Sequence, residues 1–279
     1  MSTNQPMLTF HDGRRAPQLG LGTWQLTGEA VVPAIQAAVE TGYRSIDTAA
    51  IYGNEAEVGR GIAQCGIPRE DLFVTTKVWN DRHGHDSTKT ALQESLDKLG
   101  LDYVDLYLIH WPVPREKRYL ETWEALIQLR DEGRARSIGV CNFQLNHLQK
   151  LLDGTGVLPV VNQIELHPHF QQAELRAYHD DHDIRTEAWS PLGRTQALQD
   201  PVIQELAHQL QASPAQVILR WHIQMGHMVI PKSSNPERIR ENFNLWSLHL
   251  NEAAMDRIAS LDRADGRIGP DPDNFSLMK

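Results

Sequence analysis

The sequence predicts an α/β protein, a (β/α)8 TIM barrel formed by a single domain over residues 1–279. Two observations lead to this fold class. Short β-rich runs alternate with helical patterns at intervals of about 30 residues, the size of a βαβ unit. There are eight such runs, the number that closes this barrel, and α/β barrels of about 250 residues routinely form one domain.

The main alternative is an open, doubly wound sheet that binds a dinucleotide. That fold normally has the motif G-x-G-x-x-G directly after its first strand and at the start of a helix. The segment GLGTWQ at 20–25 lacks the third glycine, and no helical pattern begins directly after it. The sequence therefore favours the barrel.

The chain opens with a predicted β-hairpin. Asp12-Gly13 is a turn signal between the β-rich run 8–10 and the run that starts at Arg14. The barrel strands that follow are short, largely apolar runs, as expected of strands in parallel sheets. They are 19–22, 44–46, 72–77, 104–109, 136–140, 160–162, 184–188 and 228–231.

The predicted helices have apolar side chains at helical spacing or begin at a capping signal. They are 29–40, one that opens at Asn54, 87–99, 121–131, 145–152, 173–180, 202–210, one that opens at Ser213-Pro214, one from Asn235-Pro236 to about 244, and an extra C-terminal helix after Asn251. Asn54 with Glu57 three residues later is a pattern of the capping-box type. Pro after Ser213 or Asn235 suits the first helical position.

The composition excludes some classes of function. Lys and Arg number 27 and Asp and Glu 36, so the net charge of −9 makes nucleic acid a poor ligand. The two cysteines, Cys65 and Cys141, cannot form a disulfide framework and suggest a reducing compartment. No apolar run is long enough for a signal peptide or a membrane span. We expect a cytoplasmic monomer whose partner is a small molecule, with no membrane partner.

Chemically distinctive side chains follow the predicted strands, where a barrel of this kind has its active site. They are Asp47, Tyr52, Lys77, His110, Trp111, Cys141, Asn142, Gln163, Trp189, Ser190, Lys232, Ser233 and Ser234. Taken singly, each has an ordinary structural interpretation, such as a helix cap or a solvated charge. Together on one rim, they predict an active site.

Four of these residues predict proton transfer to a carbonyl oxygen. The phenol of Tyr52 is a poor acid near neutral pH, and an adjacent Lys77 ammonium lowers its pKa. Asp47 keeps the buried ammonium charged, and His110 holds the substrate oxygen. Trp24, Trp79 and Trp111 are expected to form a flat apolar substrate pocket beside them.

No side chain supplies hydride, so the same rim predicts a nicotinamide cofactor. Asn142 and Gln163 are candidates to bind its carboxamide, and Trp189 offers a face for ring stacking. Lys232, with Ser233, and Arg238 lie at the predicted helix start, where barrels often bind phosphate. Two cations there favour NADP(H) over NAD; solvated surface charge is the alternative.

The motifs that bear these residues resemble the aldo-keto reductases across nearly the whole chain. The matching segments are GLGTW (20–24), GYRSIDTAAIYGNE (42–55), TTKVW (75–79), DLYLIHWP (105–112), IGVCNF (138–143), NQIELHP (162–168), AWSPLG (188–193) and IPKSSNPERIRENF (230–243). IGVCNFQ and the terminal IGPDPDNF (268–275) are similar to the bacterial 2,5-diketo-D-gluconic acid reductase branch.

The resemblance implies a barrel closed at its base by the hairpin, a catalytic tetrad and NADPH-dependent reduction of small carbonyl compounds. The implied tetrad is Asp47, Tyr52, Lys77 and His110, with Tyr52 as general acid. The implied NADPH contacts are Cys141, Asn142, Gln163, Trp189, Ser190, Leu192, Lys232, Ser233, Arg238 and Asn242. Cys141 stands where the family often has Ser, and Trp189 where it often has Tyr. The implied substrates include 2,5-diketo-D-gluconate and methylglyoxal.

Two other functions remain open from the sequence. His167-Pro168-His169 is an H-x-H pair that could, with His110 and Asp47, bind the metal of a barrel hydrolase, although carbonyl reduction with a nicotinamide cofactor requires no metal. A cofactor-binding regulatory module with little turnover is the second, and oxidation of the cofactor by a test aldehyde distinguishes it from an enzyme.

Overall fold

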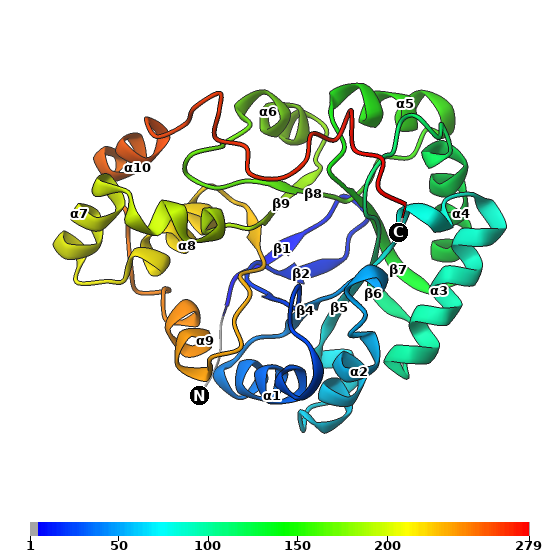
Figure 1. Ribbon diagram of the computed structural model, residues 1–279, viewed down its shortest axis with the longest axis horizontal. Coiled ribbons are helices and arrows are strands. Elements are labelled where there is room, and N and C mark those ends of the chain that lie inside the picture. Colours follow the sequence, from blue (N-terminus) through cyan, green and yellow to red (C-terminus); the bar gives the residue numbers. More distant parts are fainter. Residues whose placement is uncertain (1–4, 279) are drawn as a thin grey trace.

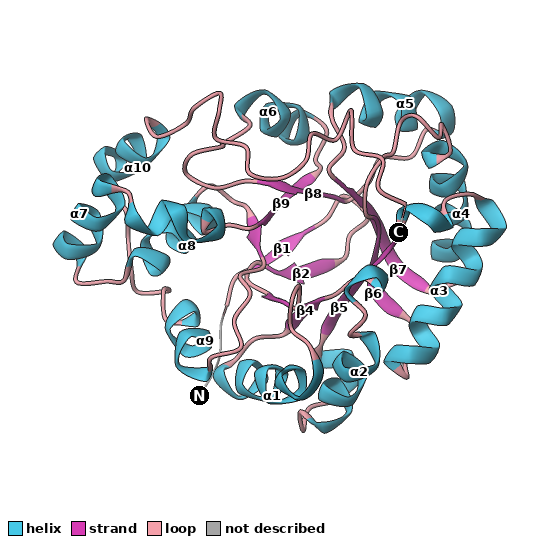
Figure 2. Cartoon of the chain, viewed as in Figure 1, coloured by secondary structure: helices cyan, strands magenta, loops and turns pink. Residues whose placement is uncertain are grey.

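A closed barrel of eight parallel strands, surrounded by helices, forms the centre of the computed structural model, which describes residues 5–278 (Figure 1, Figure 2). Parallel bridges from Leu19 to Val229 and from Gly22 to Lys232 join the first barrel strand to the last. The predicted (β/α)8 barrel is confirmed. In hydrogen-bonded order, its strands are β3 (Leu21–Gly22), β4 (Ser45–Asp47), β5 (Phe73–Val78), β6 (Val104–Ile109), β7 (Ala135–Cys141), β8 (Val161–Glu165), β9 (Arg185–Trp189) and β10 (Met228–Val229).

At least one helix follows each barrel strand, and two follow β9. The helices are α1 (Val31–Thr41), α2 (Glu55–Gln64), α3 (His85–Leu99), α4 (Tyr119–Asp131), α5 (Leu145–Thr155), α6 (Ala173–Asp181), α7 (Pro201–Leu210), α8 (Pro214–Gln224), α9 (Pro236–Phe243) and the extra C-terminal α10 (Glu252–Ala259). Among the described residues, no helix has the length and apolar character needed to cross a membrane.

Successive side chains of a barrel strand point to opposite faces, so the protein has one core between strands and helices and a second inside the barrel. Tyr107 and Ile109 of β6 point outward and pack with helix residues such as Trp123. Leu106 and Leu108 point inward and pack with Phe10 of the hairpin. Both sets are buried because helices cover one face of the strands and the barrel interior is filled with side chains.

The predicted hairpin closes the N-terminal ends of the barrel strands. Its strands β1 (Met7–Thr9) and β2 (Arg15–Pro17) are antiparallel and lie at the centre of the ring in Figure 1. The Arg185 guanidinium donates to the Thr9 carbonyl oxygen, and the Ser137 hydroxyl donates to Asp12. The base of the barrel is therefore blocked, and only its other end is available for a site.

The predicted helix caps at Ser213 and Asn235 are confirmed, and Asn251, which the sequence placed just before the last helix, caps it as well. Ser213 forms a capping box with Gln216, and Asn235 and Asn251 accept hydrogen bonds from backbone amides in their own first turns. The capping pattern at Asn54 is wrong: its side chain makes no cap hydrogen bond and binds other loops instead.

The C-terminal segment after α10 runs along one side of the ring, past α6 and β8 to a terminus near β7 and α4, as the red trace in Figure 1 shows. Glu165, at the end of β8, accepts hydrogen bonds from the amides of Ile268 and Gly269. Farther along, Trp79 donates to the Met278 carbonyl oxygen and Asn80 donates to that of Leu277. We call residues 266–278 the C-terminal strap.

Candidate active site

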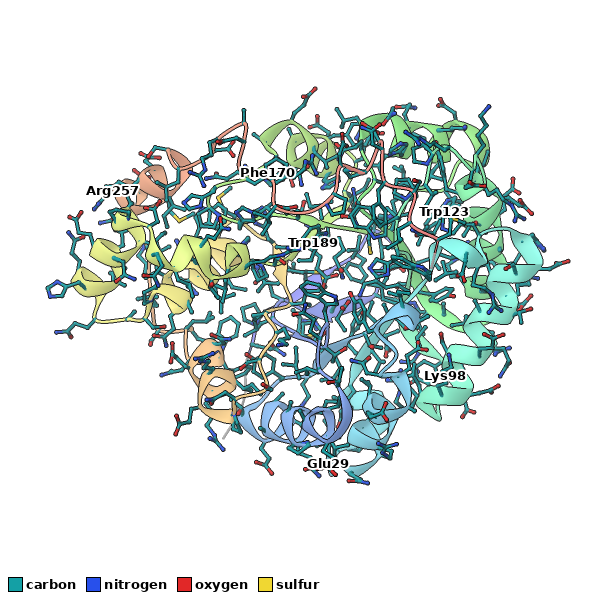
Figure 3. All side chains as sticks on the ribbon, in the orientation of Figure 1. Glu29, Lys98, Trp123, Phe170, Trp189 and Arg257 are labelled. Atoms are coloured by element: carbon teal, nitrogen blue, oxygen red, sulfur yellow. The ribbon has the colours of Figure 1, made fainter. Side chains whose placement is uncertain are left out.

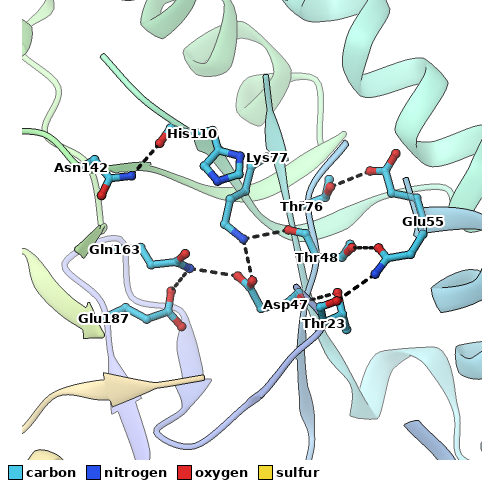
Figure 4. Close-up of polar contacts among 11 residues, drawn as sticks. Thr23, Asp47, Thr48, Glu55, Thr76, Lys77, His110, Asn142, Gln163 and Glu187 are labelled. Atoms are coloured by element: carbon cyan, nitrogen blue, oxygen red, sulfur yellow. Dashed lines mark hydrogen bonds and ion pairs between the residues drawn. The ribbon is translucent and has the colours of Figure 1, made fainter. Parts of the chain in front are cut away.

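The barrel brings the four predicted catalytic residues together at the C-terminal ends of its strands. The Lys77 ammonium donates to Asp47 Oδ1 at 2.6 Å and to the Thr48 carbonyl oxygen at 2.9 Å (Figure 4). The same nitrogen lies 5.2 Å from the centre of the Tyr52 ring. The Tyr52 and His110 rings meet edge to face at 5.7 Å.

Burial and charge act in opposite directions on the tetrad. Burial raises the pKa of the Tyr52 phenol above its ordinary value, and the Lys77 ammonium opposes the rise. The net direction differs from the lowering expected from the sequence, because desolvation of phenolate outweighs one nearby cation. The phenol is therefore protonated at neutral pH. For Lys77, burial lowers the pKa, but Asp47 reverses this and the net pKa is raised.

His110 is a neutral imidazole at neutral pH. Burial, and then the charge of Lys77, hold its pKa well below the usual value. Its Nδ1 is buried and has no hydrogen-bond partner among residues 5–278. Trp79 packs edge to face on the ring at 5.0 Å. A neutral ring has one N–H and can donate a hydrogen bond to a substrate oxygen.

The loop that carries Tyr52 is fixed by a buried amide. Asn54 donates to the carbonyl oxygens of Thr23 and Leu26 and accepts from the Thr48 hydroxyl. Tyr52 ends a short 3-10 turn, and Gly53 follows at a φ of 66°. The loops after β3 and β4 are thereby joined, which sets the position of the phenol.

Hydrogen bonds join the three residues predicted to hold the nicotinamide into one wall, and Gln163 joins the other two through its backbone carbonyl oxygen, which accepts from the Asn142 backbone amide at 2.9 Å. Asn142 donates to the His110 carbonyl oxygen and accepts from the Trp189 indole at 2.8 Å. Trp189 is half-buried and labelled near the centre of the ring in Figure 3. Gln163 donates to Asp47 Oδ2. Cys141 is fully buried behind this wall, and burial raises the pKa of its thiol.

The residues predicted to hold phosphate lie at the start of α9. Lys232 and Arg238 are exposed, and neither forms a salt bridge with any residue that the structure describes. Asn235 already accepts hydrogen bonds from the amides of Glu237 and Arg238. An anion there would therefore meet side-chain cations rather than these two amides.

The remaining residues implied as cofactor contacts lie on nearby loops and helices. Ser190 follows β9 at a φ of 48°, and Leu192 is half-buried two residues later. Ser233 and Asn242 are buried.

Two of the three predicted pocket tryptophans lie in one apolar cluster. Trp79 and Trp111 pack with Val113, and Trp189, Phe275 and Met278 complete the cluster. Phe275, from the strap, lies 4.3 Å from the Trp111 ring. Trp24 is not in this cluster: it is 42% exposed, and the Arg194 guanidinium lies 5.5 Å above its ring.

The two histidines of the H-x-H pair have other partners. His167 contacts Glu165 at 3.1 Å and His169 contacts Asp200 at 2.8 Å, so the H-x-H pair does not converge. Among residues 5–278, no three His, Cys, Asp or Glu side chains are grouped as a metal site requires. His83 is buried and neither of its ring nitrogens has a hydrogen-bond partner among residues 5–278, and His85 is half-buried.

Sequence reasoning missed two acids at this end of the barrel. Glu187 is buried and accepts a hydrogen bond from Gln163. Glu165 anchors the strap. Glu187 could have been found, because it lies two residues before Trp189 in a predicted strand and so shares its face. The partners of Glu165 are about 100 residues away and left no local signal.

The arrangement can deliver a proton from a phenol to a substrate oxygen beside an aromatic wall and a cationic patch. The profile of the Aldo/keto reductase family matches residues 18–263. The chain belongs to the aldo/keto reductase family. The resemblance seen in the motifs is confirmed.

Curated aldo-keto reductases are similar to this chain over nearly its full length. The methylglyoxal reductase DkgA of Escherichia coli (strain K12) is 52% identical over 274 residues, which cover 98% of each chain. An aldo-keto reductase of Mycolicibacterium smegmatis is 52% identical over 272 residues, again with 98% of each chain covered.

Solved aldo-keto reductase structures have the same fold. A mutant of Gox0644 in complex with NADPH has a TM-score of 0.95 and 47% identity, over 98% of this chain and 99% of that chain. A Bombyx mori aldo-keto reductase in complex with NADP has a TM-score of 0.86 and 40% identity, over 92% of each chain.

Proposed function

We propose that this aldo-keto reductase is an NADP-dependent oxidoreductase that reduces small aldehydes and ketones to alcohols, with Tyr52 as the general acid. The observation that carries the proposal is the buried Lys77–Asp47 pair, 2.6 Å apart, beside the Tyr52 ring. Family membership supports the reaction class, and relatives solved with NADPH or NADP support the cofactor.

The tetrad residues have separate roles in proton transfer. When bound, NADPH supplies the hydride for the carbonyl carbon. Tyr52 donates its phenolic proton to the carbonyl oxygen as negative charge develops there. Lys77 stabilises the phenolate that remains, and Asp47 keeps Lys77 charged. His110 orients the oxygen through a neutral N–H.

The residues of the rim fit the cofactor. Trp189 has a half-exposed ring that Asn142 holds in place, which suits stacking of a flat nicotinamide. Lys232 and Arg238 are cations with no carboxylate partner among the described residues, which suits a phosphate. The proposed contacts also include Cys141, Gln163, Ser190, Leu192, Ser233 and Asn242.

The proposed substrates are small and oxygen-rich. Methylglyoxal is supported by relatives of the DkgA type, and keto-sugar acids such as 2,5-diketo-D-gluconate by the motifs. Trp79 and Trp111 would contact the substrate beside His110, with Trp24 at the mouth. We also propose that residues 1–279 form one domain and act as a cytoplasmic monomer that binds no nucleic acid, in keeping with the net charge of −9.

The test is loss of NADPH absorbance with methylglyoxal in wild type and in Tyr52→Phe. The variant should lose on the order of 10²–10⁴ in rate, the usual contribution of a positioned acid, and keep its NADPH dissociation constant. Tyr107→Phe is the matched control, because this buried hydroxyl has no hydrogen-bond partner among residues 5–278. Near wild-type turnover in Tyr52→Phe would exclude Tyr52 as the acid.

A further inference from the structure

Besides Asp47, a second buried carboxyl group, that of Glu187, is linked to the tetrad through Gln163. Glu187 of β9 is 2% exposed and points into the barrel, as does Trp189 two residues later. The strand register pairs Glu187 with Gln163, and Gln163 with Cys141. A polar layer therefore crosses the barrel from β4 to β9, and Figure 4 shows most of it.

Gln163 connects the two carboxyl groups. Its amide nitrogen donates to Asp47 Oδ2 at 2.9 Å and to Glu187 Oε2 at 2.8 Å. An amide nitrogen has two hydrogens, so both are used. A flipped amide would direct its oxygen at the Asp47 carboxylate, which pairs with Lys77 and can only accept. Gln163 is thereby held in one orientation, with its oxygen free to accept from the carboxamide of a nicotinamide.

Glu187 has no cation of its own. Lys77 already pairs with Asp47, so ionisation of Glu187 leaves one unbalanced negative charge in a buried site. Burial, and then the charge of Asp47, raise the pKa of Glu187 to about 7.

The titratable groups that face Glu187 come from three strands: Asp47 from β4, Lys77 from β5 and Cys141 from β7. Burial raises the pKa of the Cys141 thiol, and Asp47 raises that of Lys77, so neither changes charge near neutral pH. Glu165 of β8 is occupied by the strap amides.

We propose that Glu187 is a positioning residue of the tetrad: it fixes the Gln163 amide toward the cofactor, and its ionisation makes Tyr52 a weaker acid through Gln163 and the Asp47–Lys77 pair. This inference rests on the proposed carbonyl reduction. It adds a group that senses pH to a site in which Tyr52 and Lys77 stay protonated and His110 stays neutral near neutral pH.

The sign of the effect follows from charge. As pH rises through the ionisation of Glu187, the new negative charge disfavours phenolate at Tyr52 and slows proton donation. The value of kcat/KM for reduction should fall by roughly two- to fivefold above neutral pH. The change is modest because, under Brønsted behaviour, only part of a change in the acidity of Tyr52 reaches the rate of proton transfer.

The first measurement needs no activity. Infrared difference spectra of the wild-type protein at about pH 5.5 and about pH 8.5 should show a buried protonated carboxyl band that disappears as pH rises, well above the range of ordinary carboxyl groups. Glu187→Gln should abolish that change. Asp105→Asn, which alters a buried carboxylate at the other end of the barrel, should retain it.

The second measurement separates charge from orientation. Glu187→Gln keeps an acceptor for Gln163 but no charge, so it should flatten the decline in kcat/KM and leave the NADPH dissociation constant unchanged. Glu187→Met removes the acceptor as well and should weaken NADPH binding several-fold. Asp105→Asn should keep the wild-type pH profile.

The outcomes are distinct. A wild-type spectrum with no carboxyl band that titrates near neutrality overturns the proposal, whether or not the variants fold. A wild-type pH profile in Glu187→Gln, accompanied only by a lower Tm, also overturns it by assigning Glu187 a merely structural role. If no carbonyl compound is reduced while the band titrates as expected, the proposed function fails and the assignment of Glu187 as the titrating group stands.

Discussion

At the scale of single residues, the reactivity of Tyr52 depends on a balance between desolvation and one cation. Burial makes phenolate costly, and Lys77 offsets part of that cost. The result is a phenol that is protonated at neutral pH. This state suits a general acid in the reductive direction better than a phenolate would.

Replacement of Lys77 tests this balance. Lys77→Met should raise the pKa of Tyr52 further and reduce turnover strongly, because phenolate would then form beside Asp47 alone. Residues that act as one unit are non-additive, so Tyr52→Phe/Lys77→Met should be little worse than Tyr52→Phe. Steady-state kcat of the four proteins checks this. Full additivity would mean that Lys77 acts independently of the phenol.

Cofactor preference is the second prediction at this scale. Lys232→Ala and Arg238→Ala should weaken NADPH much more than NADH, because only NADPH offers a 2′-phosphate to a charge-assisted contact. The ratio of the two dissociation constants, measured by fluorescence, is the relevant quantity. Exposed Arg240, two positions beyond Arg238 on α9, supplies the control as Arg240→Ala. Equal weakening of both cofactors would place these cations on the diphosphate or away from the site.

The sequence predicted which types of residue meet, but not all of their contacts. Asp47, Lys77 and His110 could be placed because each ends a strand, and strand ends of a barrel share one rim. The contact from Asn142 to the His110 carbonyl oxygen and the link from Gln163 to Glu187 could not, because they depend on side-chain rotamers across neighbouring strands.

At the scale of elements, local sequence patterns predicted helix caps correctly, except where the capping side chain forms tertiary hydrogen bonds instead. Ser213 and Asn235 cap their helices because nothing else competes for their side chains. Asn54 is buried between two loops and satisfies two carbonyl oxygens there, a stronger demand than a helix end that water can reach.

The C-terminal strap contributes Phe275 to the apolar cluster that forms the proposed substrate pocket. Phe275→Ala removes a ring that packs on Trp111 at 4.3 Å, so it should widen the apolar cluster and raise KM for small aldehydes severalfold. Leu277→Ala, on the same strap but 54% exposed, should leave KM unchanged. Kinetics with methylglyoxal and a bulkier aldehyde check this. An unchanged KM in Phe275→Ala would separate the strap from substrate binding.

At the scale of the whole molecule, the barrel was predictable because each strand and each helix has its own local sequence pattern, and these patterns alternate eight times along the chain. The path of the strap was not. Residues 266–278 have no helical or strand period, and their course is set by distant partners such as Glu165 and Trp79. Long-range contacts of irregular segments leave no pattern in the sequence.

The buried histidines predict how the whole molecule responds to acid. Burial lowers the pKa of His83 to about 4 and those of His179 and His227 to about 3. In the unfolded chain the ordinary value is about 6.5, so the unfolded state binds more protons and stability falls as pH drops from there toward 3. Glu187 has the opposite effect on stability between its ordinary pKa and its raised pKa of about 7, because there the folded state binds more protons. It is one group, whereas several histidines act in the other direction.

Each pKa unit is worth about 1.4 kcal/mol against a total stability of about 5–15 kcal/mol. We therefore expect cooperative acid unfolding at about pH 4–5, above the lowered pKa values of His179 and His227. Circular dichroism against pH gives the midpoint. His179→Gln should reduce the loss of stability between neutral and acidic pH, whatever its effect at neutrality. His208→Gln, on the exposed face of α7, should not. The same loss of stability in His179→Gln as in wild type would show that this histidine does not drive the transition.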